Sequence, residues 1–173
     1  MPQVTRDLVE SEVARLEAAE EEGEVVAVLG FSQGAKLAAG LLCNQQLWKA
    51  ASTSTSTSKP PSCFKFGVFL NGTSPPLFSL APAPGGSSVA PSTPDAAPTP
   101  SKQPLIAIPS LHILGTEDPW KDSSRTLFTD FFDPKTAELV ELDCGHRLPT
   151  KEEDTRKIAD GILKLWRETS EEV

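Results

Sequence analysis

The 173-residue chain lacks long hydrophobic runs. No apolar stretch approaches the roughly 20 residues that a membrane-spanning helix requires. The first residues, MPQVTRDLVESEV, are polar and acidic, which argues against a secretory signal peptide. From these absences we expect a cytoplasmic protein with no membrane partner. The length predicts one domain over residues 1–173.

Basic residues are also scarce. The chain carries 16 lysines and arginines against 24 aspartates and glutamates, and its formal net charge is −8. No basic patch with interleaved aromatic residues occurs in the sequence, so we expect no nucleic-acid partner. Much of the negative charge is glutamate near the N-terminus, which is typical of the solvated face of a helix.

Cysteine and histidine are too few for a disulfide framework or a typical metal centre. The three cysteines, Cys43, Cys63 and Cys144, form an odd count without CxxC spacing, which favours reduced thiols. The two histidines are His112 and His146. A zinc site needs several cysteine or histidine ligands at suitable spacing, and these few residues do not provide them. We therefore expect no metal.

Helix and strand patterns alternate along the chain. Helical spacing of apolar residues predicts helices over residues 5–22, 33–48 and 121–132, and a last helix from about Thr150. Short apolar runs predict strands over residues 24–30, 64–72, 105–115 and 136–142. Strands that alternate with helices predict an α/β fold with a mainly parallel sheet and helices on both faces.

Local signals refine three of these elements. The strand at 24–30 is expected to be buried. Pro109 should lie near the start of its strand proper, because proline cannot donate a hydrogen bond to a central ladder. In the last helix, Thr150 and Glu153 have the spacing of a capping box. The same helix is expected to bury a stripe made of Ile158, Ile162, Leu165 and Trp166.

Two segments do not have the composition of a packed core. Residues 51–62 are a Ser/Thr repeat, and residues 74–104 are rich in proline, alanine and serine. Such segments bury too little apolar area to offset their ordering entropy, so we expect mobile surface insertions. At most a short helical turn is expected near Leu77 to Leu80.

The stretch Gly30-Phe31-Ser32-Gln33-Gly34 has the pattern GxSxG between a predicted strand and a predicted helix. A tight turn there would strain the Ser32 backbone and hold its hydroxyl above the sheet, with small residues two positions away on either side. The N-terminal end of the helix would favour negative charge that develops near the hydroxyl. The pattern therefore predicts a nucleophilic serine; the alternative is a plain glycine-rich turn.

A nucleophilic serine needs a general base and an acid that orients the base. His146 lies in DCGHRLP, between the last predicted strand and the last predicted helix. Asp118 lies in LGTEDPW, just beyond the third strand. Because the carboxyl ends of parallel strands share one rim, we expect both side chains to meet Ser32 there. Serine nucleophiles in GxSxG turns are followed along the chain by the acid and then by the histidine, and Ser32, Asp118 and His146 have this order.

Other residues compete for these roles. Glu117 is the alternative acid, whereas Asp143 is too close to His146 in sequence to be a good partner. Asp118 could instead only cap the helix that follows. His112 sits within the apolar run IPSLHILG and is expected to be buried in the sheet, and Cys144 is expected to be a packing residue.

Together, GFSQGA, LHILGTEDPW and GHRLP resemble small eukaryotic serine hydrolases of the α/β-hydrolase superfamily, related to the ovarian-cancer-associated hydrolase. The resemblance runs from about residue 5 to residue 168. It implies an α/β-hydrolase-like fold, Ser32 as nucleophile, Asp118 as acid, His146 as base and no cofactor. The family includes fungal esterases and polyketide thioesterases, which implies an acyl ester or thioester substrate, free or bound to a carrier protein, and a role in secondary metabolism.

The sequence departs from this family at its N-terminal side. The family has an early strand with an HG-type loop that supplies one oxyanion-hole N–H, and no HG precedes Ser32 here. The resemblance then implies the Gln33 N–H, directly after the nucleophile, as the one identified oxyanion donor. It also implies that the N-terminal strands of the family's sheet are missing. We expect a serine hydrolase that forms an acyl-enzyme. The alternatives are a catalytically inactive truncated hydrolase that acts as a binding or interaction module, and an acyl transferase with the same three residues.

Overall fold

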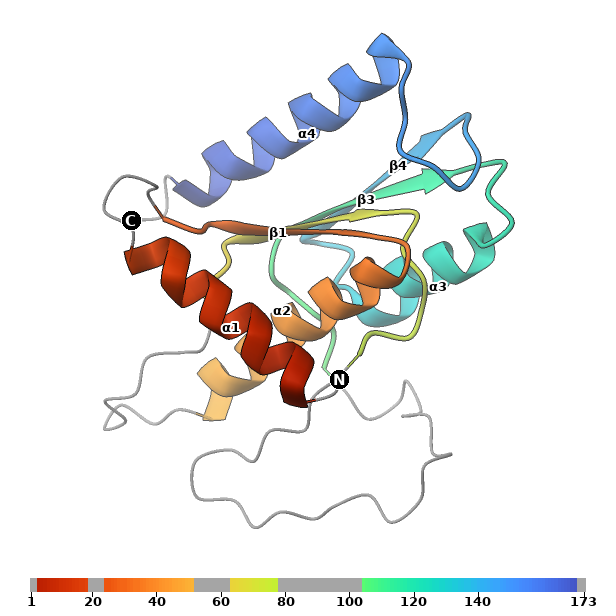
Figure 1. The fold of residues 1–173 in the computed structure, drawn as a ribbon. Coiled ribbons are helices and arrows are strands. Elements are labelled where there is room, and N and C mark those ends of the chain that lie inside the picture. Colours follow the sequence, from red (N-terminus) through yellow and green to blue (C-terminus); the bar gives the residue numbers. More distant parts are fainter. Residues whose placement is uncertain (1–2, 19–23, 52–62, 78–103, 171–173) are drawn as a thin grey trace, which may run out of the picture.

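The computed structural model describes residues 3–18, 24–51, 63–77 and 104–170, and it contains one parallel sheet (Figure 1). The four strands lie in the order β1-β2-β3-β4, and each pair of neighbours is parallel. Their bounds are Ala27–Phe31 (β1), Phe66–Leu70 (β2), Ser110–Gly115 (β3) and Ala137–Leu142 (β4). The α/β prediction with a parallel sheet is therefore confirmed, and all four carboxyl ends share one edge.

Helices cover both faces of this sheet (Figure 1). Three of them, which share a buried cluster with the sheet, are α1 (Gln3–Ala18), α2 (Gln33–Ala51) and α3 (Lys121–Phe131). The last helix, α4 (Glu152–Ser170), packs on the opposite face through Leu165, Ile158 and Ile162. This arrangement confirms the predicted α/β class, with helices on both faces of a parallel sheet.

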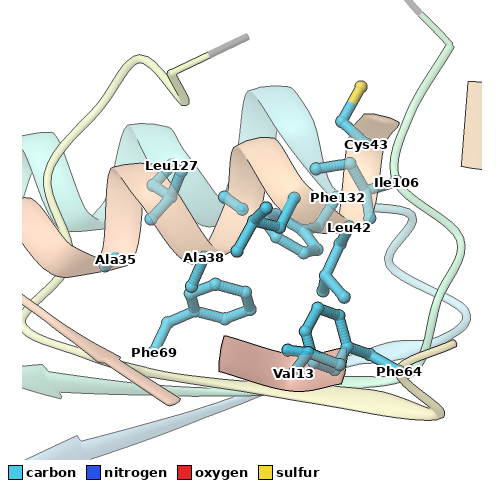
Figure 2. Close-up of a cluster of buried hydrophobic side chains, with 12 residues drawn as sticks. Val13, Ala35, Ala38, Leu42, Cys43, Phe64, Phe69, Ile106, Leu127 and Phe132 are labelled. Carbon is cyan, nitrogen blue, oxygen red and sulfur yellow. The ribbon is translucent and has the colours of Figure 1, made fainter. Parts of the chain in front are cut away.

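The larger core lies between the sheet and the first three helices (Figure 2). Small residues of α2, such as Ala35, Ala38 and Ala39, are fully or almost fully buried, which lets the helix approach the strands closely. Phe69 of β2 and Phe132, just after α3, fill the space between the layers with their rings 5.0 Å apart. This packing fixes the first turns of α2 and α3 relative to the strand ends.

The strand β1 is less buried than the sequence predicts. Leu29 at its centre is 60% exposed, and only Gly30 is fully buried in this strand. The physical reason is its position: within the described residues β1 is one of the two edge strands, and it pairs with β2 alone. By contrast, every residue of β3 is buried, because it has a strand on each side.

Helix bounds also differ in detail from the predictions. The first helix is described from Gln3 to Ala18, and the predicted remainder lies outside the described residues. The last helix begins at Glu152, two residues after Thr150, so the predicted capping box is out of step with it. Trp166 is 48% exposed and does not belong to the buried stripe, whereas Asp154 of the same helix is buried.

The two predicted insertions lie almost entirely outside the described residues. Ala51, the first residue of the segment 51–62, is the last residue of α2. Residues 74–77 of the second segment follow β2 in an irregular conformation, and the predicted turn near Leu77 to Leu80 lies mostly outside the described part. Pro109 directly precedes β3, as the sequence predicts.

Candidate active site

Ser32 lies in a sharp turn between β1 and α2. Its φ angle is 54°, which lies in the left-handed region that residues other than glycine adopt only with backbone strain. The turn is held by the Ser32 N–H, which donates to the Leu70 carbonyl at 3.0 Å, and by the Ala35 N–H, which donates to the Ser32 carbonyl at 3.1 Å. The predicted strained turn is confirmed, and it puts the serine at the carboxyl end of the sheet.

The two glycines of GxSxG are not equally constrained. A Cβ atom on Gly30 would lie 2.6 Å from the Ala35 Cα and from the Gly34 carbonyl oxygen, so glycine is required there. A Cβ atom on Gly34 would meet nothing within 4 Å in the described residues. The expectation that both positions must be small is therefore right for Gly30 and wrong for Gly34, since α2 turns back across the first glycine only.

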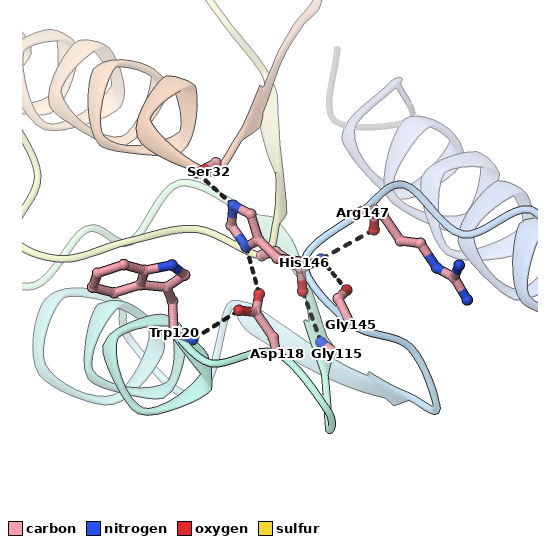
Figure 3. Close-up of polar contacts among 8 residues, drawn as sticks. Ser32, Gly115, Asp118, Trp120, Gly145, His146 and Arg147 are labelled. Atoms are coloured by element: carbon pink, nitrogen blue, oxygen red, sulfur yellow. Dashed lines mark hydrogen bonds and ion pairs between the residues drawn. The ribbon is translucent and has the colours of Figure 1, made fainter.

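A hydrogen-bond chain runs from Ser32 through His146 to Asp118 (Figure 3). The Ser32 Oγ lies 2.8 Å from His146 Nε2, and His146 Nδ1 lies 2.7 Å from Asp118 Oδ2. The imidazole thus contacts both partners with opposite ring nitrogens, although the three residues are far apart in sequence. The ring of Phe31, next to the serine, packs against the imidazole with a centroid distance of 5.1 Å.

Asp118 is fixed by contacts of its own. Its side chain is buried, and its Oδ1 accepts a 2.7 Å hydrogen bond from the Trp120 N–H while Oδ2 faces His146. The Asp118 carbonyl also accepts the Lys121 N–H at 3.1 Å, at the start of α3. The carboxylate therefore supports the turn before α3 and contacts the histidine at the same time, so the two interpretations of Asp118 are not exclusive.

The competing acids lie elsewhere. Glu117 is exposed, and its backbone N–H donates to the Cys144 carbonyl at 3.1 Å. Asp143 is exposed and lies 3.7 Å from the Lys151 ammonium. Among the described carboxylates, Asp118 is the one hydrogen-bonded to His146.

His112 is buried in β3, as the sequence predicts. Its imidazole stacks on Phe69 and meets the edges of Phe128 and Phe132, with centroid distances of 4.7, 5.2 and 4.4 Å. Its Nε2 lies 3.3 Å from the Ser110 hydroxyl. Because this surrounding is apolar, burial lowers the pKa of His112 to about 3, and the imidazole is neutral at pH 7.

Asn71 is a site residue that sequence reasoning missed. It follows β2, is 1% exposed and has a φ angle of 44°, which asparagine tolerates better than most residues. Its Oδ1 accepts the Gly115 N–H at 2.7 Å. Its Nδ2 donates to the carbonyls of Gly145 and Arg147, at 3.3 and 3.2 Å, on either side of His146. One buried amide thus joins the end of β3 to the histidine loop.

The end of β3 approaches the histidine loop too closely for a side chain. A Cβ atom on Gly115 would lie 2.4 Å from the Cys144 carbonyl oxygen and 3.1 Å from Asn71 Oδ1. Glycine at this position therefore allows the loops that carry Asp118 and His146 to lie against each other. The sequence signal for this is the glycine at the end of LHILG, two residues before the acidic pair Glu117-Asp118.

The first turn of α2 offers a backbone donor beside the serine. Gln33 is the first residue of α2, and its N–H has no hydrogen-bond acceptor among the described residues. Ser32, Gln33, Trp120 and Ser123 line a pocket of about 260 Å³ together with neighbouring side chains. The arrangement can place a carbonyl oxygen near this N–H and its carbon near the Ser32 Oγ.

Other reactive groups are poorly suited to chemistry here. Cys144 is buried close to the site, and burial, followed by the charge of Asp154, raises the pKa of its thiol. A raised thiol pKa disfavours the nucleophilic thiolate. No three His, Cys, Asp or Glu side chains of the described residues lie together in a way that could hold a metal ion. None of the described helices is both long and apolar enough to cross a membrane.

Comparison with solved structures finds a similarity to a plant protein. The crystal structure of Zea mays acyl-protein thioesterase 2 superposes with a TM-score of 0.49 and 20% identity, over 92% of this chain and 64% of that chain.

Comparison with known sequences finds fungal esterases. Esterase claE of Penicillium crustosum is 35% identical over 158 residues, which cover 85% of this chain and 57% of the relative. Esterase citA of Monascus ruber is 38% identical over 150 residues, which cover 85% and 56%. The chain thus spans about half the length of the curated relatives it matches. A family model described as serine hydrolase (FSH1) matches residues 3–158. Since this match covers most of the sequence, the chain belongs to the serine hydrolase (FSH1) family.

Proposed function

We propose that this chain hydrolyses an acyl ester or thioester through Ser32, His146 and Asp118. The observation that carries the proposal is the pair of hydrogen bonds made by His146, 2.8 Å to the Ser32 Oγ and 2.7 Å to the Asp118 carboxylate. The strained backbone of Ser32 supports it, because strain at a polar residue is typical of catalytic turns. The esterase names of the relatives support the same class of reaction.

In the proposed reaction, His146 Nε2 removes the proton from the Ser32 Oγ, and the oxygen attacks the substrate carbonyl carbon. The Gln33 N–H donates to the oxyanion that forms. His146 then protonates the leaving oxygen or sulfur, which yields an acyl-enzyme on Ser32. A water molecule that is deprotonated by His146 attacks the acyl group and releases the acid. Asp118 holds the imidazole in position and stabilises its protonated form.

The wider setting is part of the same proposal. The substrate is a small-molecule ester or thioester, free or held by a carrier protein, and the protein acts in the cytoplasm. Residues 1–173 act as one domain in this scheme. An alcohol in place of water would make the same acyl-enzyme a transferase intermediate.

Labelling with a fluorophosphonate probe tests the proposal. We expect the folded chain to gain one covalent adduct on Ser32, located by mass spectrometry of the peptides, and Ser32→Ala to gain none. Circular dichroism must show that both proteins are folded. A folded chain that does not react would mean that the serine is not activated, and it would favour the alternative of an inactive hydrolase that acts as a binding module.

A further inference from the structure

The pocket beside Ser32 is formed by three segments that meet at the carboxyl end of the sheet. The segment after β2 is tied to the serine and to both neighbouring helices. The Thr73 N–H donates to the Ser32 carbonyl at 3.3 Å, the Ser74 N–H to the Ser123 hydroxyl at 2.9 Å, and the Leu77 N–H to the Lys36 carbonyl at 2.9 Å. The pocket, about 260 Å³, therefore has walls that the chain itself holds in place.

Most of the side chains that line this pocket carry a polar group. Apart from Ser32, it contains the side chains of Gln33, Thr73, Ser74 and Ser123. The Thr73 hydroxyl is buried and has no hydrogen-bond partner in the described part of the chain. The pocket therefore offers hydrogen-bonding groups beside an apolar contact surface.

Lys36 is the charged residue of the lining. It lies one helical turn, about 5 Å along the axis, from the start of α2, so its side chain can reach a group close to the reacting carbonyl. Its side chain is half-buried, and no carboxylate of the described residues forms an ion pair with it. Other lysines do have such partners: Lys65 pairs with Glu24, and Lys164 with Glu138.

Trp120 supplies the one aromatic surface of the lining within the described residues. Its backbone N–H donates to Asp118 Oδ1 at 2.7 Å (Figure 3). Its side chain lines the pocket and is 59% exposed. A large exposed aromatic residue lines the same pocket as a lysine that forms no ion pair in the described part of the chain. Together they offer a flat contact and a charge to a single ligand.

From these contacts we propose that the substrate carries an anionic group, a carboxylate or a phosphate, within a few atoms of the scissile carbonyl, and that Lys36 binds this group while Trp120 contacts the adjoining chain. The inference rests on the proposed hydrolase function and specifies its substrate class. Lys36 acts here as a specificity-determining residue, because an ammonium in a partly buried pocket attracts a carboxylate more strongly than it does in bulk water.

A matched pair of esters tests this inference. The 4-nitrophenyl monoester of succinic acid carries a carboxylate in its acyl chain, and 4-nitrophenyl butyrate is its neutral counterpart. The quantity of interest is the ratio of kcat/KM for the anionic ester to that for the neutral ester. We expect Lys36→Gln to lower this ratio roughly tenfold, as for loss of one charge-assisted hydrogen bond. Lys36→Arg should retain the ratio, and Lys36→Glu should lower it further.

The control is Lys49→Gln, in the last turn of the same helix and remote from the pocket. It should leave the ratio unchanged. If Lys36→Gln has the same ratio as the wild type while Ser32 still reacts with the fluorophosphonate, the substrate inference is wrong and the hydrolase proposal stands. If wild-type Ser32 does not react, the hydrolase proposal fails, and the inference fails with it. A phosphate-bearing ester in the same comparison distinguishes the two anions.

Discussion

The two histidines of this chain show how strongly position in the fold decides what a side chain can do. His112 lies within β3 among three phenylalanine rings, where burial lowers its pKa to about 3. His146 lies in the loop after β4, where its ring nitrogens contact Ser32 and Asp118. The first residue contributes packing, whereas the second has the contacts of a general base. A histidine inside a parallel strand cannot reach the strand end where ligands bind, and one just beyond it can.

The largest effect should come from removing the carboxylate that faces His146. Asp118→Asn keeps the size of the side chain but no longer stabilises a protonated imidazole, so we expect kcat for an activated ester to fall about 10⁴-fold. The matched control is Asp143→Asn. Asp143 is an exposed aspartate near His146 in sequence, and it forms an ion pair with Lys151. Equal losses in both variants would contradict the assignment of Asp118.

A smaller effect is expected when the support of the histidine loop is removed. Asn71→Gly keeps the left-handed backbone accessible but removes the contacts to Gly115, Gly145 and Arg147. We expect the free energy of unfolding to fall by about 2 to 3 kcal/mol and kcat to fall more than KM changes. Urea denaturation and ester hydrolysis measure the two quantities.

The control for this prediction is Asn44→Ala in α2. The Asn44 Nδ2 is buried without a hydrogen-bond partner in the described part of the chain, so removing it should not lower stability. An Asn71→Gly protein with wild-type stability and kcat would show that the loop is held by other contacts.

The pH dependence of stability should reveal His112. Its pKa in the folded chain, about 3, lies below the ordinary value of 6.5, so the unfolded chain binds the extra proton between these values. The neutral histidine therefore contributes its full stability above about pH 6.5 and loses it as the pH falls. We expect a loss of about 1.4 kcal/mol per pH unit below that point. In His112→Phe this pH-dependent loss of stability should disappear. Urea denaturation from pH 7 to pH 5 measures it, and a free energy of unfolding that falls with pH as steeply as in the wild type would contradict the prediction.

The smallest effect concerns the serine turn. Gly34→Ala should raise the free energy of unfolding by about 0.5 to 1 kcal/mol, because the added methyl group meets no described atom and alanine favours the helix. Gly30→Ala should instead lower the free energy of unfolding, and by more than this amount, since its methyl group would collide with the Ala35 backbone. Thermal denaturation of the two variants compares them, and a loss of stability in both would show that Gly34 is constrained as well.

Much of the fold could be predicted because its signals are local. The alternation of apolar runs and helical spacing identified each strand and helix to within a few residues, and Gly30 with Ser32 marked the turn between β1 and α2. The sequence also predicted that Asp118 and His146 would lie at the strand ends, since each follows a strand directly. Parallel pairing then brings these ends together without further information.

The features that escaped prediction depend on distant neighbours. Asn71 contacts backbone groups 44, 74 and 76 residues away, and nothing near it in sequence indicates them. The exposure of Leu29 depends on which strands pair with β1, and the freedom at Gly34 depends on the direction in which α2 leaves the turn. Trp166 has helical spacing with buried residues but lies at the margin of the contact between α4 and the sheet.

The most direct test of the account compares the two histidines by the rate at which Ser32 reacts with a fluorophosphonate. We predict that His146→Gln lowers the second-order rate constant by at least about 100-fold, because the serine loses its general base. His112→Phe should react at the wild-type rate. A His146→Gln protein that is folded and reacts as fast as the wild type would contradict the claim that His146 activates Ser32.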